Sequence, residues 1–235
     1  EPSQRVEVAF VIDGDTLALK DGTRVRLIGV DTPELGKQGA TDEPYSVAAR
    51  DGLKTLLERY KNQVELVYDA NRTDRYRRTL AHVYVDQNIS VQAWLLKSGL
   101  AFNLTLPPNL KNQACYFSYA QKSRRDKLGV WGADYFQPLD AESIPSTARG
   151  YRQVIGEVVS VKSARNGATW LNLKGGKFSA QVVASDLPLF DDLALTTLVG
   201  KRLTLQGYLI RLPQRNSKKY RFFLRLRHPE AIQIN

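Results

Sequence analysis

The alternation of hydrophobic and polar residues predicts strands through much of the first half of the chain. Residues 6–12, 16–20 and 25–30 are rich in β-branched and apolar residues, and Asp21-Gly22 signals a hairpin turn between the last two. Two further strands are predicted at 64–68 and 80–85. This half therefore contains a hairpin followed by more strands.

Helical spacing of apolar residues interrupts these strands at three places. Pro44 suits the first turn of a helix that continues to about residue 60. Ser90 suits the cap of a second helix that ends at Gly99. A third helix is predicted over about 110–128, with Gly129 as its stop.

The second half returns to strands after an aperiodic segment. Residues 137–150 contain two prolines and are interpreted as a linker. A short helix is expected between 187 and 199, before the fourth of five strands, which is the order expected of an OB-type barrel. The five strands are predicted at 154–161, 169–173, 178–184, 203–212 and 220–227.

The expected fold class is therefore mainly β with helices (α+β). Residues 1–136 are predicted to form an OB-type five-stranded barrel with helices, and residues 151–235 a second OB-like barrel after the 137–150 linker.

Charge adds a partner class to this picture. The chain has 235 residues, 43% of them hydrophobic, and a formal charge of +10. Residues 151–235 carry 14 Lys and Arg against 5 Asp and Glu, whereas residues 1–150 are nearly neutral. A basic segment of this kind favours a polyanion such as nucleic acid. No apolar run approaches the roughly 18 residues of a membrane span, and the single Cys115 excludes an internal disulfide.

Four acidic residues stand where strands are expected. "VIDGDTLAL" contains Asp13 and Asp15, and "VDTPE" contains Asp31 and Glu34. A two-residue turn would bring Asp15 and Asp31 to the same end of one hairpin, with glycines nearby that leave room for a ligand. Two carboxylates with a backbone carbonyl suit a hard cation such as calcium. Ordinary turn and cap chemistry is the alternative explanation.

Two arginines accompany these acids. Arg26 lies on the returning strand, and Arg78 lies in "TDRYRRTLAHVY", where another strand begins. A guanidinium binds phosphate through two parallel hydrogen bonds, so an acid-bound cation beside both arginines would form a phosphodiester site. Taken alone, each arginine could equally be a solvated charge.

Together these motifs resemble the thermonucleases, or staphylococcal nuclease-like domains. "IDGDT", "VRLIGVDTPE", "TDRYRRTLAHVY", "LLKSGLA" and "AQKSRRDKLGVWG" occur in the family's order over roughly residues 5–132.

The resemblance implies a calcium-dependent enzyme that cleaves DNA and RNA and leaves 3′-phosphate ends. It implies calcium ligands, a base for the attacking water, and two arginines that bind the phosphate. The implied ligands are the carboxylates of Asp15 and Asp31 and the backbone carbonyl of Thr32; Glu34 is the implied base, and Arg26 and Arg78 the phosphate residues. Asp13 is then structural, and Tyr76, which follows Asp74 in the family's segment, is a substrate contact.

Two positions depart from the family's pattern. Arg77 stands where the family usually has glycine, and "FNLTLPPNL" lacks the tyrosines expected after "SGLA". Base stacking at that segment is therefore not expected to follow the family.

Other readings remain open. The first barrel could be an inactive binding module of the same fold, although its catalytic set is complete. A nuclease with a histidine base has only His82 and His228 to draw on, and neither has a metal-ligand partner at useful spacing. The absent initial methionine and the calcium-type site predict an extracytoplasmic protein, secreted or periplasmic.

The last predicted strand, "YRFFLRLRH", carries a candidate binding face in the second barrel. A basic face with an aromatic residue suits single-stranded nucleic acid, and domain packing or a protein partner is the rival. The residues of this face are Arg221, Phe223, Arg225 and Arg227.

Overall fold

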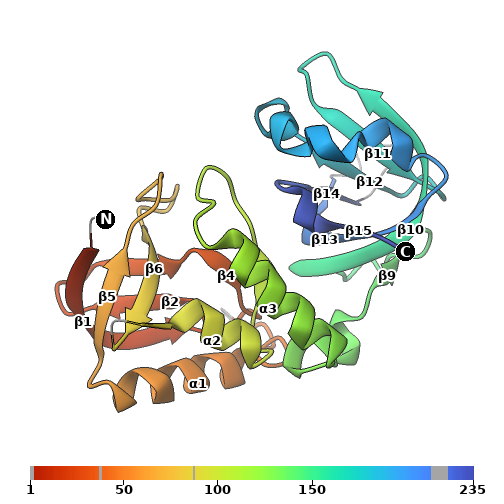
Figure 1. The fold of residues 1–235 in the computed structure, drawn as a ribbon. Coiled ribbons are helices and arrows are strands. Elements are labelled where there is room, and N and C mark those ends of the chain that lie inside the picture. The colour runs from red at the N-terminus through yellow and green to blue at the C-terminus, as the bar shows by residue number, and fades with distance from the viewer. Residues whose placement is uncertain (1–2, 37–38, 87, 213–221) are drawn as a thin grey trace. The chain divides into compact units, whose positions relative to one another are not determined.

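The computed structural model describes residues 3–36, 39–86, 88–212 and 222–235. The chain divides into two compact units, Glu1–Tyr135 and Phe136–Asn235 (Figure 1). Among the described residues, no helix is long and apolar enough to cross a bilayer.

The first unit is built on a closed barrel. Its strands pair antiparallel except where β3 runs parallel to β6 and closes the ring. Leu17, Val25 and Val83 are fully buried in its interior. The predicted OB-type barrel is therefore confirmed. The barrel strands are β1 (Ser3–Asp13), β2 (Thr16–Leu19), β3 (Arg24–Leu27), β5 (Gln63–Val67) and β6 (Thr79–Val85).

The β2–β3 hairpin has a different register from the expected one. Thr16 pairs with Arg26, and Leu17 with Val25. The turn contains three residues rather than two, because Leu19 donates to the carbonyl of Thr23 and Gly22 takes a positive φ of 86°. The chain then bends after β3, so Gly29 and Asp31 belong to a separate strand, β4 (Gly29–Asp31), which pairs with β8 (Phe102–Leu104).

Three helices accompany the first barrel, with α2 and α3 packed beside each other (Figure 1). The Ser90 hydroxyl accepts from the amide of Ala93, which confirms the predicted cap of the second helix. The third helix begins later than expected, because Asn112 has a left-handed backbone and cannot continue a helix. The helices are α1 (Ser46–Arg59), α2 (Val91–Lys97) and α3 (Gln113–Arg125), with a short strand β7 (Ile89–Ser90) and 3-10 turns η1 (Gly129–Trp131) and η2 (Asp134–Phe136).

The second unit is also a closed barrel, as predicted. Here the parallel pair is β12 with β14, and β13 returns to β10. Its core includes Leu171, Ala180 and Leu224, each fully buried. The barrel strands are β10 (Tyr151–Ser163), β11 (Thr169–Leu173), β12 (Phe178–Val182), β13 (Arg202–Arg211) and β14 (Phe222–Arg225). The expected helix is present as the 3-10 segments η3 (Ala184–Leu193) and η4 (Leu195–Leu198), and η6 (Pro229–Ala231) and β15 (Ile232–Ile234) end the chain.

The segment expected as a linker is folded onto the second unit. A two-residue strand, β9 (Leu139–Asp140), pairs parallel with β10, and Ala141 is fully buried in the second core. A two-residue strand is too short to produce an alternating pattern, so the sequence around β9 predicts an irregular segment. Gln153 also donates to the carbonyl of Phe136 at 3.4 Å. We therefore place the domain boundary next to Tyr135 and not after residue 150.

Candidate active site

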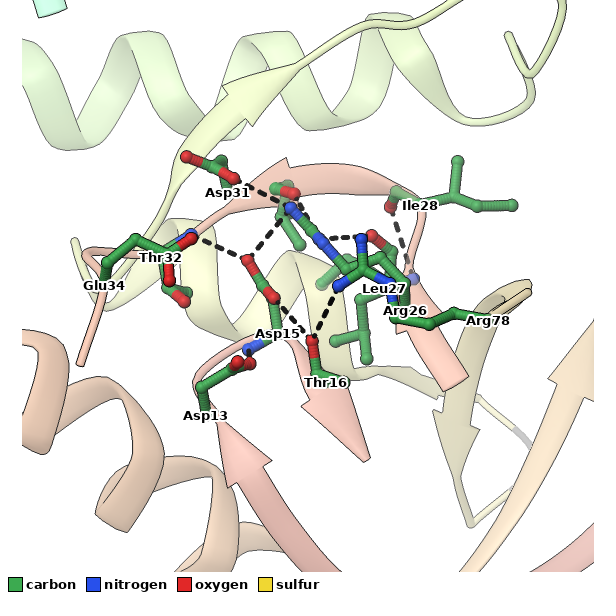
Figure 2. Close-up of polar contacts among 12 residues, drawn as sticks. Asp13, Asp15, Thr16, Arg26, Leu27, Ile28, Asp31, Thr32, Glu34 and Arg78 are labelled. Carbon is green, nitrogen blue, oxygen red and sulfur yellow. Dashed lines mark hydrogen bonds and ion pairs between the residues drawn. The ribbon is translucent and has the colours of Figure 1, made fainter. Parts of the chain in front are cut away.

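Two buried carboxylates form the centre of the site. Asp15 and Asp31 are 6% and 2% exposed. The guanidinium of Arg26 lies between them, with Nη2 at 3.0 Å from Asp15 Oδ2 and 2.8 Å from Asp31 Oδ1 (Figure 2). Its Nη1 donates to the carbonyls of Leu27 and Val30, both at 2.8 Å. The arginine thus places one positive charge between two buried carboxylates and fixes the bend after β3.

Asp15 also joins the β1–β2 turn to the chain after β4. Its Oδ2 accepts from the backbone amide of Thr32 at 3.0 Å, and its Oδ1 from the hydroxyl of Thr16 at 3.0 Å (Figure 2). Thr32 is 3% exposed. One carboxylate therefore aligns the backbone that carries the predicted metal ligands.

The glycines beside the acids were expected to leave room for a ligand. In the structure, protein atoms fill the space next to both of them. A Cβ on Gly14 would lie 2.7 Å from the Thr32 hydroxyl and 2.7 Å from the Ala49 Cβ. A Cβ on Gly29, whose φ is +83°, would lie 2.5 Å from the Tyr116 ring. Both positions require glycine because another chain segment packs directly against the backbone.

Glu34 is exposed, and its backbone is held by Glu43, a residue not predicted from the sequence. The amide of Glu34 donates to Glu43 Oε2 at 3.0 Å, and the amide of Glu43 donates to the carbonyl of Glu34 at 3.0 Å. Glu43 is 8% exposed, and its Oε1 accepts from the hydroxyl of Tyr135 at 3.2 Å. Nothing in the sequence signals this pair, because Glu43 looks like one more acid of a polar loop before Pro44.

Arg78 is the more accessible of the two arginines. Its side chain is 28% exposed, against 12% for Arg26. Its Nε donates to Asp74 Oδ2 at 2.7 Å. Its Nη1 lies 3.5 Å from the Thr16 hydroxyl (Figure 2). The hydrogen bond to Thr16, which itself bonds Asp15, brings Arg78 beside the acid pair.

The turn before Arg78 is stabilised by Asp74. Its Oδ1 accepts from the amides of Tyr76 at 2.8 Å and Arg78 at 2.9 Å. Burial acts to raise the pKa of Asp74, but these hydrogen bonds and the positive charge of Arg78 outweigh it and lower the pKa below its ordinary value. Arg77, which replaces the family's glycine, has a φ of +63°. The usual glycine is thus explained by the backbone of this turn.

Tyr76 projects from the same turn and is 64% exposed. The guanidinium carbon of Arg75 lies 4.7 Å from the centre of its ring, and that of Arg78 5.6 Å. The exposed ring therefore lies beside Arg78, on the same turn.

Asp13 supports the site from below. Its Oδ1 accepts from the amide of Asp15 at 3.2 Å. Burial, and then the charge of Asp15, raise the pKa of Asp13 to about 6. The Asp13 carboxyl thus holds the backbone of Asp15 in place.

The donor set fits calcium chemically. Asp15, Asp31 and the carbonyl of Thr32 offer only oxygen, which hard cations prefer. Within the described ranges, no cluster of three or more His, Cys, Asp or Glu side chains is arranged to hold a metal. A cation there would therefore depend on two carboxylates, a carbonyl and water.

The histidines do not support a histidine-based reaction. His82 is fully buried, with Nδ1 at 2.9 Å from the Tyr116 hydroxyl. His228 lies in the second unit, where burial lowers its pKa and its Nδ1 accepts from the amide of Glu230.

The predicted binding face of the second barrel is altered. Phe223 is only 7% exposed, because the Trp170 ring packs on it with ring centres 5.6 Å apart. Arg227 forms an ion pair with the buried Asp186. Arg225 is exposed as expected, and Arg221 lies outside the described residues.

Comparison with known proteins identifies the first unit. A family model described as staphylococcal nuclease homologue matches residues 24–133. A thermonuclease of Staphylococcus intermedius is 41% identical over 128 residues, which cover 53% of this chain and 74% of the relative. The chain belongs to the staphylococcal nuclease family.

Two further relatives extend this comparison. A thermonuclease of Staphylococcus hyicus is 38% identical over 131 residues, 54% of this chain and 76% of the relative. Endonuclease YncB of Bacillus subtilis (strain 168) is 40% identical over 125 residues, 51% of this chain and 58% of the relative. The predicted family and the nuclease class of enzyme are therefore confirmed for the staphylococcal nuclease unit. The family model ends at residue 133, before the second barrel.

Proposed function

We propose that the chain hydrolyses phosphodiester bonds of DNA, RNA or both, with calcium, to products that end in 3′-phosphate. The observation that carries this proposal is the arrangement of an exposed Glu34 and a partly exposed Arg78 around the buried Asp15–Arg26–Asp31 group. Its relatives are named thermonuclease and endonuclease, which supports the reaction class.

In the proposed reaction, Glu34 removes a proton from the water that attacks phosphorus. A positioned base of this kind contributes about 10² to 10⁴-fold. Arg78 donates to phosphate oxygens as negative charge increases in the transition state, and its planar fork suits two of them. Tyr76 lines the approach beside Arg78.

Arg26 has a different task in this scheme. Its hydrogen bonds to both acids keep two buried negative charges close together, which would otherwise repel each other. Asp15, Asp31 and the carbonyl of Thr32 are the residues that would hold calcium. When bound, calcium would supply positive charge that neutralises the phosphate.

The second barrel is proposed to assist nucleic-acid binding. Support comes from the 14 basic against 5 acidic residues of 151–235 and from the exposed Arg225. An extracytoplasmic location, secreted or periplasmic, stays a prediction.

The alternative function is an inactive module that binds nucleic acid or protein through the same fold. The hydrogen bonds that position Glu34 and Arg78 argue against an inactive module, because a binding module does not require a positioned base. Digestion of single-stranded DNA, duplex DNA and RNA decides between the two, with calcium, magnesium or excess chelator. Calcium-dependent cleavage to 3′-phosphate ends supports the proposal. Binding without cleavage under every condition would establish the inactive module.

A further inference from the structure

A row of polar and aromatic side chains crosses the outer face of the second barrel. In the strand register, Trp170 is opposite Lys162 on one side and Gln181 on the other, and Gln181 aligns with Arg225. Their neighbours along each strand point inward, as the full burial of Leu171, Ala180 and Leu224 in the core requires. The row, Lys162–Trp170–Gln181–Arg225, therefore faces away from the core across β10, β11, β12 and β14.

Trp170 is a partly exposed ring held on a firm support. Phe223 lies beside it, with ring centres 5.6 Å apart and an angle of 53° between the planes. The guanidinium carbon of Arg225 lies 6.0 Å from the centre of the Phe223 ring. Phe223 is nearly buried, so it supports Trp170 and Arg225 and does not itself offer a stacking surface. This arrangement fixes an aromatic platform next to a cation.

The charges of the row match a polyanion. Lys162 and Arg225 are exposed and lie at its two ends, and the row contains no acidic residue. Strands lie about 4.8 Å apart, so Arg225 is about 10 Å from Trp170 across the sheet. That spacing accommodates a base on the indole and a phosphate at the guanidinium. Stacking on an aromatic residue beside basic side chains is how proteins bind single strands without sequence preference.

We propose that this row binds single-stranded nucleic acid, with a base stacked on Trp170 and backbone phosphates at Lys162 and Arg225. The inference deepens the proposed function and rests on it, because it assumes that the nuclease acts on nucleic acid. Trp170 is then the main nucleic-acid contact of the second barrel. The row replaces the binding face predicted from the sequence, which included Phe223 and Arg227.

The test measures binding of a labelled oligothymidylate to the full chain in excess chelator, which keeps the strand uncut, at several salt concentrations. Trp170→Ala is expected to weaken binding about 5- to 100-fold, and Trp170→Phe much less, because phenylalanine retains a stacking face. The double variant Lys162→Gln/Arg225→Gln is expected to lower the log–log salt slope by about 1.4, roughly 0.7 for each lost phosphate contact.

Lys174→Gln is the matched control. Lys174 is exposed in the turn between β11 and β12 and lies off the row, so its loss should leave affinity nearly unchanged. Wild-type affinity in Trp170→Ala, or equal losses in Lys174→Gln and the double variant, would overturn the inference and leave the face for a protein partner. Hydrolysis is read separately with calcium and saturating substrate. If Trp170→Ala loses binding but the wild-type protein shows no hydrolysis, the proposed nuclease activity is refuted and the proposed binding row still stands.

Discussion

Glu34 and Glu43 are joined by two hydrogen bonds that run in opposite directions. The amide of Glu34 donates to the Glu43 carboxylate, and the amide of Glu43 donates to the Glu34 carbonyl, both at 3.0 Å. The intervening loop is therefore closed at its base. Because Glu34 is the proposed base and is exposed, this closure fixes where its carboxylate can reach.

Glu43→Ala is expected to lower kcat about 10- to 100-fold with little change in KM, because a displacement of about 1 Å costs roughly that much. Glu43→Gln retains one carbonyl oxygen that can accept from Glu34 and should keep most of the activity. Tyr135→Phe removes the hydrogen bond to Glu43 Oε1 and leaves Oε2 in place, so it serves as the control for general disturbance. Steady-state kinetics decides the matter: an alanine variant with unchanged kcat would mean that the loop holds Glu34 without this carboxylate.

Arg78 is expected to stabilise the negative charge that develops on the phosphate in the transition state. Arg78→Ala should lower turnover by about 10² to 10³-fold, as removal of one transition-state donor does. Arg78→Lys should restore little, because lysine lacks the planar fork and cannot keep the Nε bond to Asp74. Arg75→Ala, on the same turn, is the matched control. Near wild-type turnover in both Arg78 variants would transfer the role to Arg77 or another residue.

Asp74 links this turn to pH. Its pKa is lowered in the folded protein from an ordinary value of 3.8, so its carboxylate stabilises the fold above that pH and the contribution disappears as pH falls below it. Asp74→Asn retains an acceptor for the two amides but loses the ion pair with Arg78, and should cost about 1 kcal/mol at pH 7. Denaturant unfolding at pH 7 and near pH 3 measures this. The difference between the two proteins should shrink at the lower pH; a constant difference would exclude the charge of Asp74 as its cause.

Arg77 has a left-handed backbone that glycine adopts without strain. Arg77→Gly is expected to raise the free energy of unfolding by about 0.5–1 kcal/mol, the relief of strain being partly offset by the greater freedom of glycine in the unfolded chain. Arg77→Ala removes the same charge but keeps a Cβ, so it should show no such gain. Equal stabilities for the two variants would show that charge, and not backbone conformation, matters at this position.

The sequence was most informative where function and local geometry demand particular residues. Short motifs selected Asp15, Asp31 and Arg78 as candidate site residues because their order in the chain is distinctive, and the structure brings the three close together. The strand register was harder to predict. The β2–β3 turn has three residues, and the chain bends after β3, so Asp31 lies on a separate strand. That position depends on tertiary pairing with β8, which the local sequence does not show. Glu43 was missed for the same reason, since its partners lie 9 and 92 residues away along the chain.

Alternation along the last barrel strand gave the correct inward and outward faces but not their exposure. Phe223 does point away from the core, yet Trp170 on another strand covers it. Arg227 was expected in solvent, but the buried Asp186 needs a partner, and an unpaired buried carboxylate is costly. A single strand cannot reveal which residues of other strands will cover or neutralise its side chains.

The two units are expected to divide chemistry and binding between them. Each has its own closed barrel, and the residues of the candidate active site all lie in Glu1–Tyr135. Strand β9 and Ala141 belong to the second core, so a truncation must end at Tyr135; a cut near residue 145 would leave core residues of the missing barrel attached. The fragment 1–135 should remain folded and retain calcium-dependent activity at saturating substrate.

The same fragment should bind nucleic acid more weakly and with a flatter dependence on salt. The removed barrel carries most of the excess positive charge, and each lost phosphate contact takes about 0.7 to 0.9 from the log–log slope. Binding isotherms of the full chain and the fragment, measured in chelator at several salt concentrations, provide the comparison. Circular dichroism of the fragment is the control that separates weak binding from failure to fold. Identical slopes for two folded proteins would mean that the basic barrel does not contact nucleic acid, and that its charge serves another partner.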